Sequence, residues 1–253
     1  MSGRMIVRVC GLAALLSAAP SFGTFAADAE SPAAAWKAGT ATIVITPQQP
    51  MWMAGYASRN KPSEGAVHDL NATALALEDD RGERLVILNL DLIGIPGDLR
   101  DWLEKELAAK HQLSPQSLLV NASHTHCGPV VRANTTYMPK EQAEKARQFL
   151  DSLRQQLVDV AGRALDSLAP AALSYSFGRA GFAMNRRTPT DSGFRNFPYP
   201  DGPVDHQVPV LMVKDTKNAL KAVLFGYACH STTLGFYQFC GDYSGFAKRY
   251  LEE

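Results

Sequence analysis

The sequence lacks any excess of charge of one sign and has few cysteines. Its 253 residues contain 25 lysines and arginines against 25 aspartates and glutamates, so the formal net charge is zero. Because nucleic-acid-binding proteins carry clustered basic residues and no basic block stands out here, we expect no nucleic-acid partner. Of four cysteines, one lies near the N-terminus and the others are Cys127, Cys229 and Cys240. Three cysteines leave at least one thiol unpaired, and the sequence allows a disulfide between Cys229 and Cys240.

Several catalytic signatures are also missing. The chain contains no G-x-S-x-G elbow, no P-loop, no G-x-G-x-x-G fingerprint and no H-E-x-x-H helix. These absences remove the usual sequence support for serine esterases, nucleotide- or dinucleotide-binding enzymes and that class of zinc proteases.

The N-terminus has no apolar run long enough to span a bilayer as a helix. The apolar residues 9–16 follow Arg4 and Arg8 and precede a stretch of small residues. This order is typical of a secretory signal peptide, with a retained membrane anchor as the alternative. We therefore predict a signal peptide over 1–27, a linker over 28–38, and export to the periplasm or the medium.

The periodicity of the remaining chain predicts one α/β or α+β domain over 39–253, with helices flanking a mixed β-sheet. A strand–helix–strand unit with a right-handed crossover is expected in its first half. The last helix stops after about two turns without a terminating signal, so the domain is expected to be incomplete at its C-terminal end. Strands are expected at 39–46, 72–79, 84–94, 117–123, 171–178, 207–214 and 220–228, and helices at 97–111, 140–168 and from 243.

Two predicted strands end in histidines. The segment NASHTHCGPV (121–130) places His124 and His126 two residues apart, so in an extended chain both point to the same side. His230 follows a second apolar strand, in VLFGYACHSTTLG. Imidazole is a common zinc donor, and ligand sites collect at the carboxyl ends of strands, so these positions predict a metal site there. Histidines that simply bond to neighbouring carbonyls remain the alternative.

Other polar residues near predicted strand ends are candidates for the same site. Arg186 lies in the loop FAMNRRTPTD and offers planar, permanently charged donors suited to an oxyanion or carboxylate, although for a generic Arg-Arg pair a solvated loop is the better explanation. Asp91 closes an apolar strand and Asp242 precedes the last helix, so either carboxylate could orient an imidazole. Three further histidines are expected to be structural or exposed: His68, His111 and His206.

These segments resemble, in order, those of the neutral (alkaline, non-lysosomal) ceramidases. SHTHCGP is similar to that family's S-H-T-H-S-G-P, MAGYASR to its M-x-G-Y-A loop and MNRR to its N-R-S loop. PVDHQVPVLMV, YACHSTTLG and CGDYSGFAKRYLEE resemble its V-D-x-x-x-x-V-L-R-F, A-x-H-P/G-T-S-M and S-D-N-x-G-Y-A-S segments. Each motif is weak, but the six occur in family order over residues 40–253, which makes the resemblance specific.

The resemblance implies a zinc-dependent amidase that cleaves ceramide to a sphingoid base and a fatty acid. It assigns His124 and His230 as zinc ligands. His126 and Arg186 match catalytic groups that hold the reacting carbonyl or its oxyanion, and Gly55 with Arg186 contacts the substrate. The implied partner is a ceramide-type lipid or another small acylated molecule, and peripheral contact with a membrane is compatible with it.

The sequence also departs from the family pattern. The family's other zinc ligands, a glutamate and a tyrosine, and the serine of its G-D-V-S-P-N segment match no position up to residue 253. Cys127 stands where the family has serine, so its thiolate could alter the choice of metal, and Ser231 replaces proline or glycine. Two alternatives therefore stay open: an exported metal hydrolase of another amide or ester, and a non-catalytic domain that binds a metal or lipid.

Overall fold

The computed structural model describes residues 36–132, 134 and 136–253. The predicted signal peptide and most of the predicted linker lie outside the described residues, so both remain predictions. Among the helices of the described part, none is long and apolar enough to cross a membrane.

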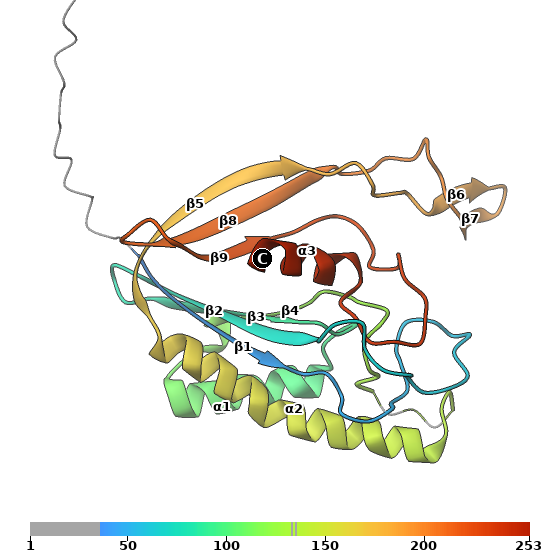
Figure 1. The fold of residues 1–253 in the computed structure, drawn as a ribbon, viewed down its shortest axis with the longest axis horizontal. Coiled ribbons are helices and arrows are strands. Elements are labelled where there is room, and N and C mark those ends of the chain that lie inside the picture. Colours follow the sequence, from blue (N-terminus) through green and yellow to red (C-terminus); the bar gives the residue numbers. More distant parts are fainter. Residues whose placement is uncertain (1–35, 133, 135) are drawn as a thin grey trace, which may run out of the picture. The chain divides into compact units, whose positions relative to one another are not determined.

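The main element is a seven-stranded mixed sheet in the order β4-β3-β2-β1-β5-β8-β9 (Figure 1). Strands β3 and β4 pair in parallel, whereas the other neighbouring strands pair antiparallel. The mixed sheet with flanking helices confirms the predicted fold class. The strands are β1 (Trp36–Val44), β2 (Asn71–Asp79), β3 (Arg84–Leu90), β4 (Leu118–Ala122), β5 (Ala169–Arg179), β8 (Gln207–Asp215) and β9 (Leu220–Phe225).

Helix α1 (Gly97–His111) connects the two parallel strands, over the residues that the sequence predicted. It begins directly after Pro96, and it ends where Gln112 adopts a left-handed conformation with φ 53°. Its buried side chains are leucines at helical spacing, so the apolar stripe seen in the sequence is the face that packs on the sheet. A 3-10 turn, η1 (Pro115–Ser117), then leads into β4.

Helix α2 (Lys140–Asp166) lies with α1 on one face of the β1–β4 part of the sheet (Figure 1). The strands under it carry small residues. A Cβ on Gly39 of β1 would overlap the carbonyl oxygen of Ala164, so glycine lets the helix approach the strand closely. In β2, Ala72, Ala74 and Ala76 are fully buried toward the same side.

Alternation along β2 and β3 divides the interior into two clusters. Val86 and Leu88 belong to the main core between the sheet and the two helices, whereas the intervening Ile87 belongs to a smaller cluster. Since successive side chains of a strand point to opposite faces, both faces of β3 are buried. This explains why the sequence of β3 is apolar almost throughout.

The remaining strands are less buried than β2 and β3. A hairpin of β6 (Arg187–Thr190) and β7 (Gly193–Asn196) extends between β5 and β8, and the sequence did not predict it. Nearly all its residues are exposed, so its two short strands carry no apolar alternation that would reveal them. Helix α3 (Asp242–Glu252) lies on the side of the sheet opposite α1 and α2 (Figure 1).

Candidate metal centre

Three imidazoles meet at the ends of β4 and β9. His124, His126 and His230 each offer one ring nitrogen, and these atoms lie within 4.8 Å of one another. The Nε2 atoms of His126 and His230 are 2.8 Å apart. Among the described residues, this is the group of histidine, cysteine and carboxylate side chains that could hold a metal ion.

His124 is oriented by its backbone and by one hydrogen bond. Its φ of 58° places its backbone in the left-handed region, which is uncommon for residues other than glycine and asparagine and is often found at functional sites. Its Nδ1 lies 2.6 Å from the carbonyl oxygen of Ile93. A carbonyl can only accept, so Nδ1 carries the proton and Nε2 keeps a free lone pair, as in most protein metal sites.

The convergence of His124 and His126 was predicted, but the physical reason differs from the predicted one. Strand β4 ends at Ala122, before the first histidine, and the segment from His124 onward is not extended. The left-handed turn at His124, rather than strand alternation, brings the two rings to a centroid distance of 5.2 Å.

The aromatic loop after β1 packs on His126. A Cβ on Gly55, whose φ is 98°, would overlap the imidazole ring, so this position requires glycine for both space and backbone conformation. The ring of Tyr56 meets His126 edge-on with centroids 5.0 Å apart, and its hydroxyl donates to the carbonyl of Leu234. Gly55, which the resemblance assigns to the site, therefore touches one of the three histidines.

Arg186 reaches the site from the loop before β6. Its guanidinium contacts Nδ1 of His230, and because arginine can only donate, that nitrogen accepts. The proton of a neutral His230 is then on Nε2, which donates to Nε2 of His126. His126 in turn carries its proton on Nδ1, a buried atom that makes no hydrogen bond within the described residues.

Burial controls the charge of these rings. It lowers the pKa of His126 to about 4, and the neighbouring His230, His124 and Arg186 act in the same direction. Burial, followed by Arg186, also lowers the pKa of His230. Both rings are therefore neutral near pH 7, which is the form that binds a metal ion.

Arg59 ties three loops together around the site, and the sequence reasoning missed it. This buried side chain donates to the carbonyl oxygens of Ala54, His126 (2.6 Å) and Phe236 (3.0 Å). Its guanidinium also lies over the ring of Tyr56, 4.8 Å from the centroid. The MAGYASR motif contains Arg59, but nothing in its spacing shows that the side chain turns inward.

The two candidate carboxylates contact other groups instead of the imidazoles. Asp91 accepts from Nζ of Lys248, at 2.6 Å to each oxygen, and from the backbone of Asn71. Asp242 accepts from the hydroxyl and backbone of Thr233 and from the backbone of Leu234. Both are fully buried and shape the loops near the site, without the direct role of orienting an imidazole that was expected.

The cysteines also differ from expectation. Cys127 is fully buried and lies against Cys240, so its sulfur is outside the group of metal donors. Cys229 contacts the carbonyl of the adjacent His230 through its sulfur. The neighbour of Cys240 is thus Cys127 rather than Cys229, and all three are free thiols in the structure.

The remaining histidines are structural, as expected. Nε2 of His68 accepts from the backbone of Gly241, and Nδ1 of His206 bonds to the carbonyl of Ala180. His111 ends α1 and packs on Gly162 of α2.

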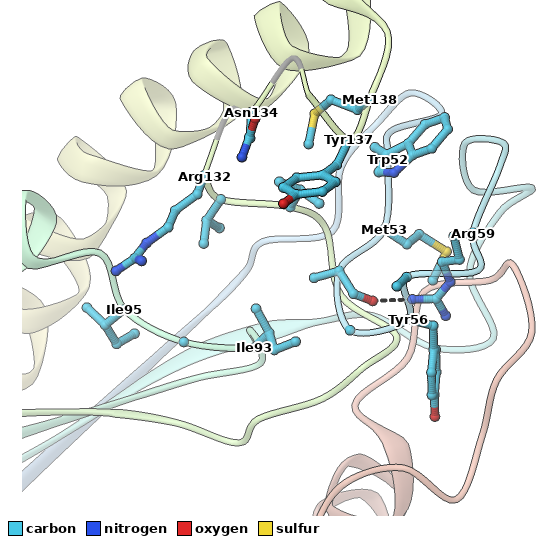
Figure 2. A pocket seen from close by; sticks show the side chains of 16 residues that line it. Trp52, Met53, Tyr56, Arg59, Ile93, Ile95, Arg132, Asn134, Tyr137 and Met138 are labelled. Atoms are coloured by element: carbon cyan, nitrogen blue, oxygen red, sulfur yellow. Dashed lines mark hydrogen bonds between the residues drawn. The ribbon is translucent and has the colours of Figure 1, made fainter.

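A cavity of about 680 Å³ lies behind the loops that hold His124 and His126, although none of the three histidines lines it. It shares Gly55 and Tyr56 with the wall behind His126, and Ile93 with the carbonyl that holds His124. Figure 2 shows Ile93 and Ile95 on one side of this space and Trp52, Tyr137 and Met138 on the other. The lining is mainly apolar, and its volume is within the range of small-molecule sites.

Comparison with known proteins gives the family. Residues 36–253 match the model of the N-terminal part of neutral/alkaline non-lysosomal ceramidase. The chain belongs to this family. A comparison with curated protein sequences gives no match.

Two solved structures have a similar fold. The structure of neutral ceramidase from Pseudomonas aeruginosa matches with a TM-score of 0.71 and 24% identity, over 86% of this chain and 36% of that chain. A ceramidase complexed with C2 matches with a TM-score of 0.69 and 25% identity, over 86% and 35% of the two chains. The chain therefore spans about a third of the length of these ceramidases.

Proposed function

We propose that this chain carries the histidine part of a zinc-dependent amidase site that acts on a ceramide-type lipid. The reaction adds water to the N-acyl bond and releases a sphingoid base and a fatty acid. The observation that carries the proposal is the convergence of three imidazoles next to loops that line an apolar cavity. Membership of the ceramidase family supports the reaction class and the lipid-like substrate.

The donor set fits a zinc ion. His124 presents a free Nε2 lone pair, because its Nδ1 donates to a backbone carbonyl. One ring nitrogen of His230 lies within 4.8 Å of those of His124 and His126, and zinc readily takes imidazole nitrogen. When bound, zinc would polarise the amide carbonyl and lower the pKa of a water molecule. In the family, a glutamate and a tyrosine complete the ligand set, so we propose activity only for the completed site.

Arg186 and His126 are proposed to act on the carbonyl oxygen. With Nε2 of His230 engaged as a ligand, the proton of a neutral ring belongs on Nδ1, which can then no longer accept from Arg186. The guanidinium of Arg186 would then be free of His230 and available to a substrate oxygen. A positive donor already placed at the site stabilises the negative charge that develops on that oxygen. His126 is kept neutral by burial, so it is suited to donate a hydrogen bond to that oxygen but adds no positive charge.

The cavity is proposed to hold a hydrocarbon chain of the substrate. Its walls include isoleucine, valine, methionine and aromatic side chains, and Gly55 also lines it. An apolar cavity of this kind favours an acyl or sphingoid chain over a peptide or a sugar. Gly55 lets its loop, which lines the cavity, pack directly on the ring of His126.

Metal content tests the proposal directly. Wild-type protein is expected to contain close to one zinc per chain by elemental analysis, and the His124→Ala variant is expected to lose it. His111→Gln, at the end of α1 and away from the site, is the matched control and should keep the wild-type zinc content. Absence of zinc from the wild-type chain would contradict the metal site in this chain.

Substrate class needs its own assay, on a protein with the completed ligand set. Hydrolysis of a ceramide much faster than that of short amides or esters would support the lipid amidase. A preference for a short amide or ester would contradict the lipid amidase and indicate a hydrolase of another acylated substrate. Stoichiometric zinc without hydrolysis of any of these compounds would favour a metal- or lipid-binding role.

We also propose that residues 1–27 direct export. The support is the charged start, the short apolar run and the small residues that follow. N-terminal sequencing of the protein recovered from the periplasm or medium should begin near residue 28. An uncleaved chain retained with membranes would instead indicate an anchor.

A further inference from the structure

Two cysteines from distant parts of the sequence meet in the interior. Cys127 follows the second site histidine, and Cys240 precedes α3. Both side chains are fully buried. Each thiol is the largest influence on the pKa of the other, lowering that of Cys127 and raising that of Cys240, and Sγ of Cys127 also lies 3.6 Å from the carbonyl oxygen of Leu234. The exposed fraction of each residue is 0%.

The backbone holds the two cysteines at close range. The N–H of Cys240 donates to the carbonyl of Cys127 at 3.1 Å. Thr125 adds a second tie, because its hydroxyl donates to the carbonyl of Cys240 at 2.7 Å and accepts from the N–H of Cys127 at 3.0 Å. The direct N–H···O bond therefore keeps the two backbones adjacent, and a disulfide between them requires a Cα separation of roughly 4.4–6.8 Å.

We propose that Cys127 and Cys240 form a disulfide in the exported protein. The two thiols together lose two protons and two electrons as the S–S bond forms. The electrons pass to the disulfide of an oxidised thiol–disulfide oxidoreductase or of oxidised glutathione, which is reduced to two thiols. Because both sulfurs are buried in the folded chain, the bond forms during folding, before these segments pack. The proposal depends on export, since the cytosol keeps thiols reduced.

The pairing leaves Cys229 as the odd thiol. Its sulfur is directed to the carbonyl of His230, next in sequence, at 3.8 Å. A Cys127–Cys240 bond therefore uses two of the three cysteines after the predicted leader and leaves Cys229 as the single free thiol.

The disulfide would anchor the histidine loop. It would join the segment that carries His124 and His126 to the start of α3, where Asp242 holds the turn at Thr233 and Leu234. The loop that it closes is about a hundred residues long, and cross-links of such loops strongly restrict the unfolded chain. We therefore expect the bond to stabilise the fold around the site, with or without a bound metal.

Peptide mapping tests the pairing on the wild-type chain. The full chain is produced in the bacterial periplasm, which sets the compartment by experiment, and is purified without reductant. It is then denatured, alkylated and digested. We expect one cross-linked peptide pair containing Cys127 and Cys240, with Cys229 alkylated. Alkylation of all three residues, or a cross-link that includes Cys229, would overturn the proposal.

Thermal unfolding gives a second readout that does not depend on catalysis or zinc. Reduction should lower the Tm of the wild type by about 10 °C, as for a cross-link closing a loop of this length. The matched control Cys229→Ser should show the same drop. Cys240→Ser should show none, because the bond is already absent. An unchanged Tm in the reduced wild type would count against the disulfide, whatever the outcome of the zinc measurements.

Discussion

The part of the sheet formed by β1–β4 differs sharply from the part formed by β5, β8 and β9. Helices α1 and α2 pack on the first part, and its central strands β2 and β3 are largely buried. In the second part most strand residues are exposed or half-buried, and Tyr175 and Phe177 on β5 are among its exposed aromatic side chains.

The candidate metal centre takes its residues from both parts. His124 and His126 follow β4, at the edge of the helix-covered part, whereas His230 follows β9 and Arg186 precedes the exposed hairpin. The helix-covered part thus supplies two imidazoles, and the less buried part supplies the third imidazole and the arginine. The difference implies that side chains in the first part contribute most to the free energy of unfolding. The local stability of the second part is expected to depend more on a metal ion or ligand bound at the site.

The largest expected effect concerns the core. Leu88 of β3 is fully buried against the helices, whereas Leu211 of β8 is half-buried. Leu88→Ala should reduce the free energy of unfolding by about 3 kcal/mol, because it leaves a cavity in a close-packed region. Leu211→Ala should cost about 1 kcal/mol. Chemical denaturation measures both, and equal losses would remove the proposed difference between the two parts.

Zinc is expected to couple the two parts. In the wild type, zinc should slow amide hydrogen exchange both at residues 123–127 and at residues 228–233, since one ion would link both segments. His230→Ala should weaken zinc binding about 100-fold or more, equivalent to about 2.7 kcal/mol at 25 °C, and abolish the slowing in both segments. Protection confined to residues 123–127 in the wild type would mean that the second part contributes no ligand.

Arginines in the two parts should differ in their contribution to stability. Arg59→Met should cost about 2 kcal/mol, because three buried or half-buried carbonyl oxygens lose their donor. Arg195 is exposed on β7, where its guanidinium lies over the ring of Phe197. Arg195→Met should therefore change stability by less than about 0.5 kcal/mol. Thermal unfolding of the two variants in parallel provides the measurement, and a large loss for Arg195→Met would contradict it.

The smallest effect concerns pH. Burial, with the nearby Arg249, lowers the pKa of His68, whose Nε2 accepts from the backbone of Gly241. The unfolded chain therefore binds a proton more readily than the folded chain, so stability should fall as the pH drops below about 6.5 and toward the lower folded pKa. His68→Gln keeps an acceptor but cannot titrate. Its Tm should depend less on pH between 7 and 5 than that of the wild type, and identical profiles would rule out this contribution.

Much of the fold could be predicted because its signals are local. The leucines of α1 repeat at helical spacing, and the structure begins and ends that helix at the predicted residues. The apolar run of β3 correctly indicated a strand buried on both faces. The hairpin β6–β7 could not be predicted in this way, because its exposed residues leave no periodic pattern.

The residues of the site were easier to predict from the sequence than the geometry in which they meet. Strand-end position identified His124 and His230, and the motif order identified the family. The inward turn of Arg59 left no mark in the sequence, and neither did the contacts of Asp91 with Lys248 and of Cys127 with Cys240. Each depends on residues far apart in the chain, which spacing and periodicity cannot bring together.

By itself, therefore, the sequence determined the order of the seven strands of the main sheet and of the three helices, the mixed sheet and the three histidines near strand ends. These follow from periodicity and from short motifs, which act over a few residues. Only the tertiary structure decided that His124 turns left-handed toward His126, that Arg186 contacts His230 and that Cys240 faces Cys127. Such pairings are set by how distant segments pack, because burial and hydrogen bonding act on whichever groups the fold brings into contact.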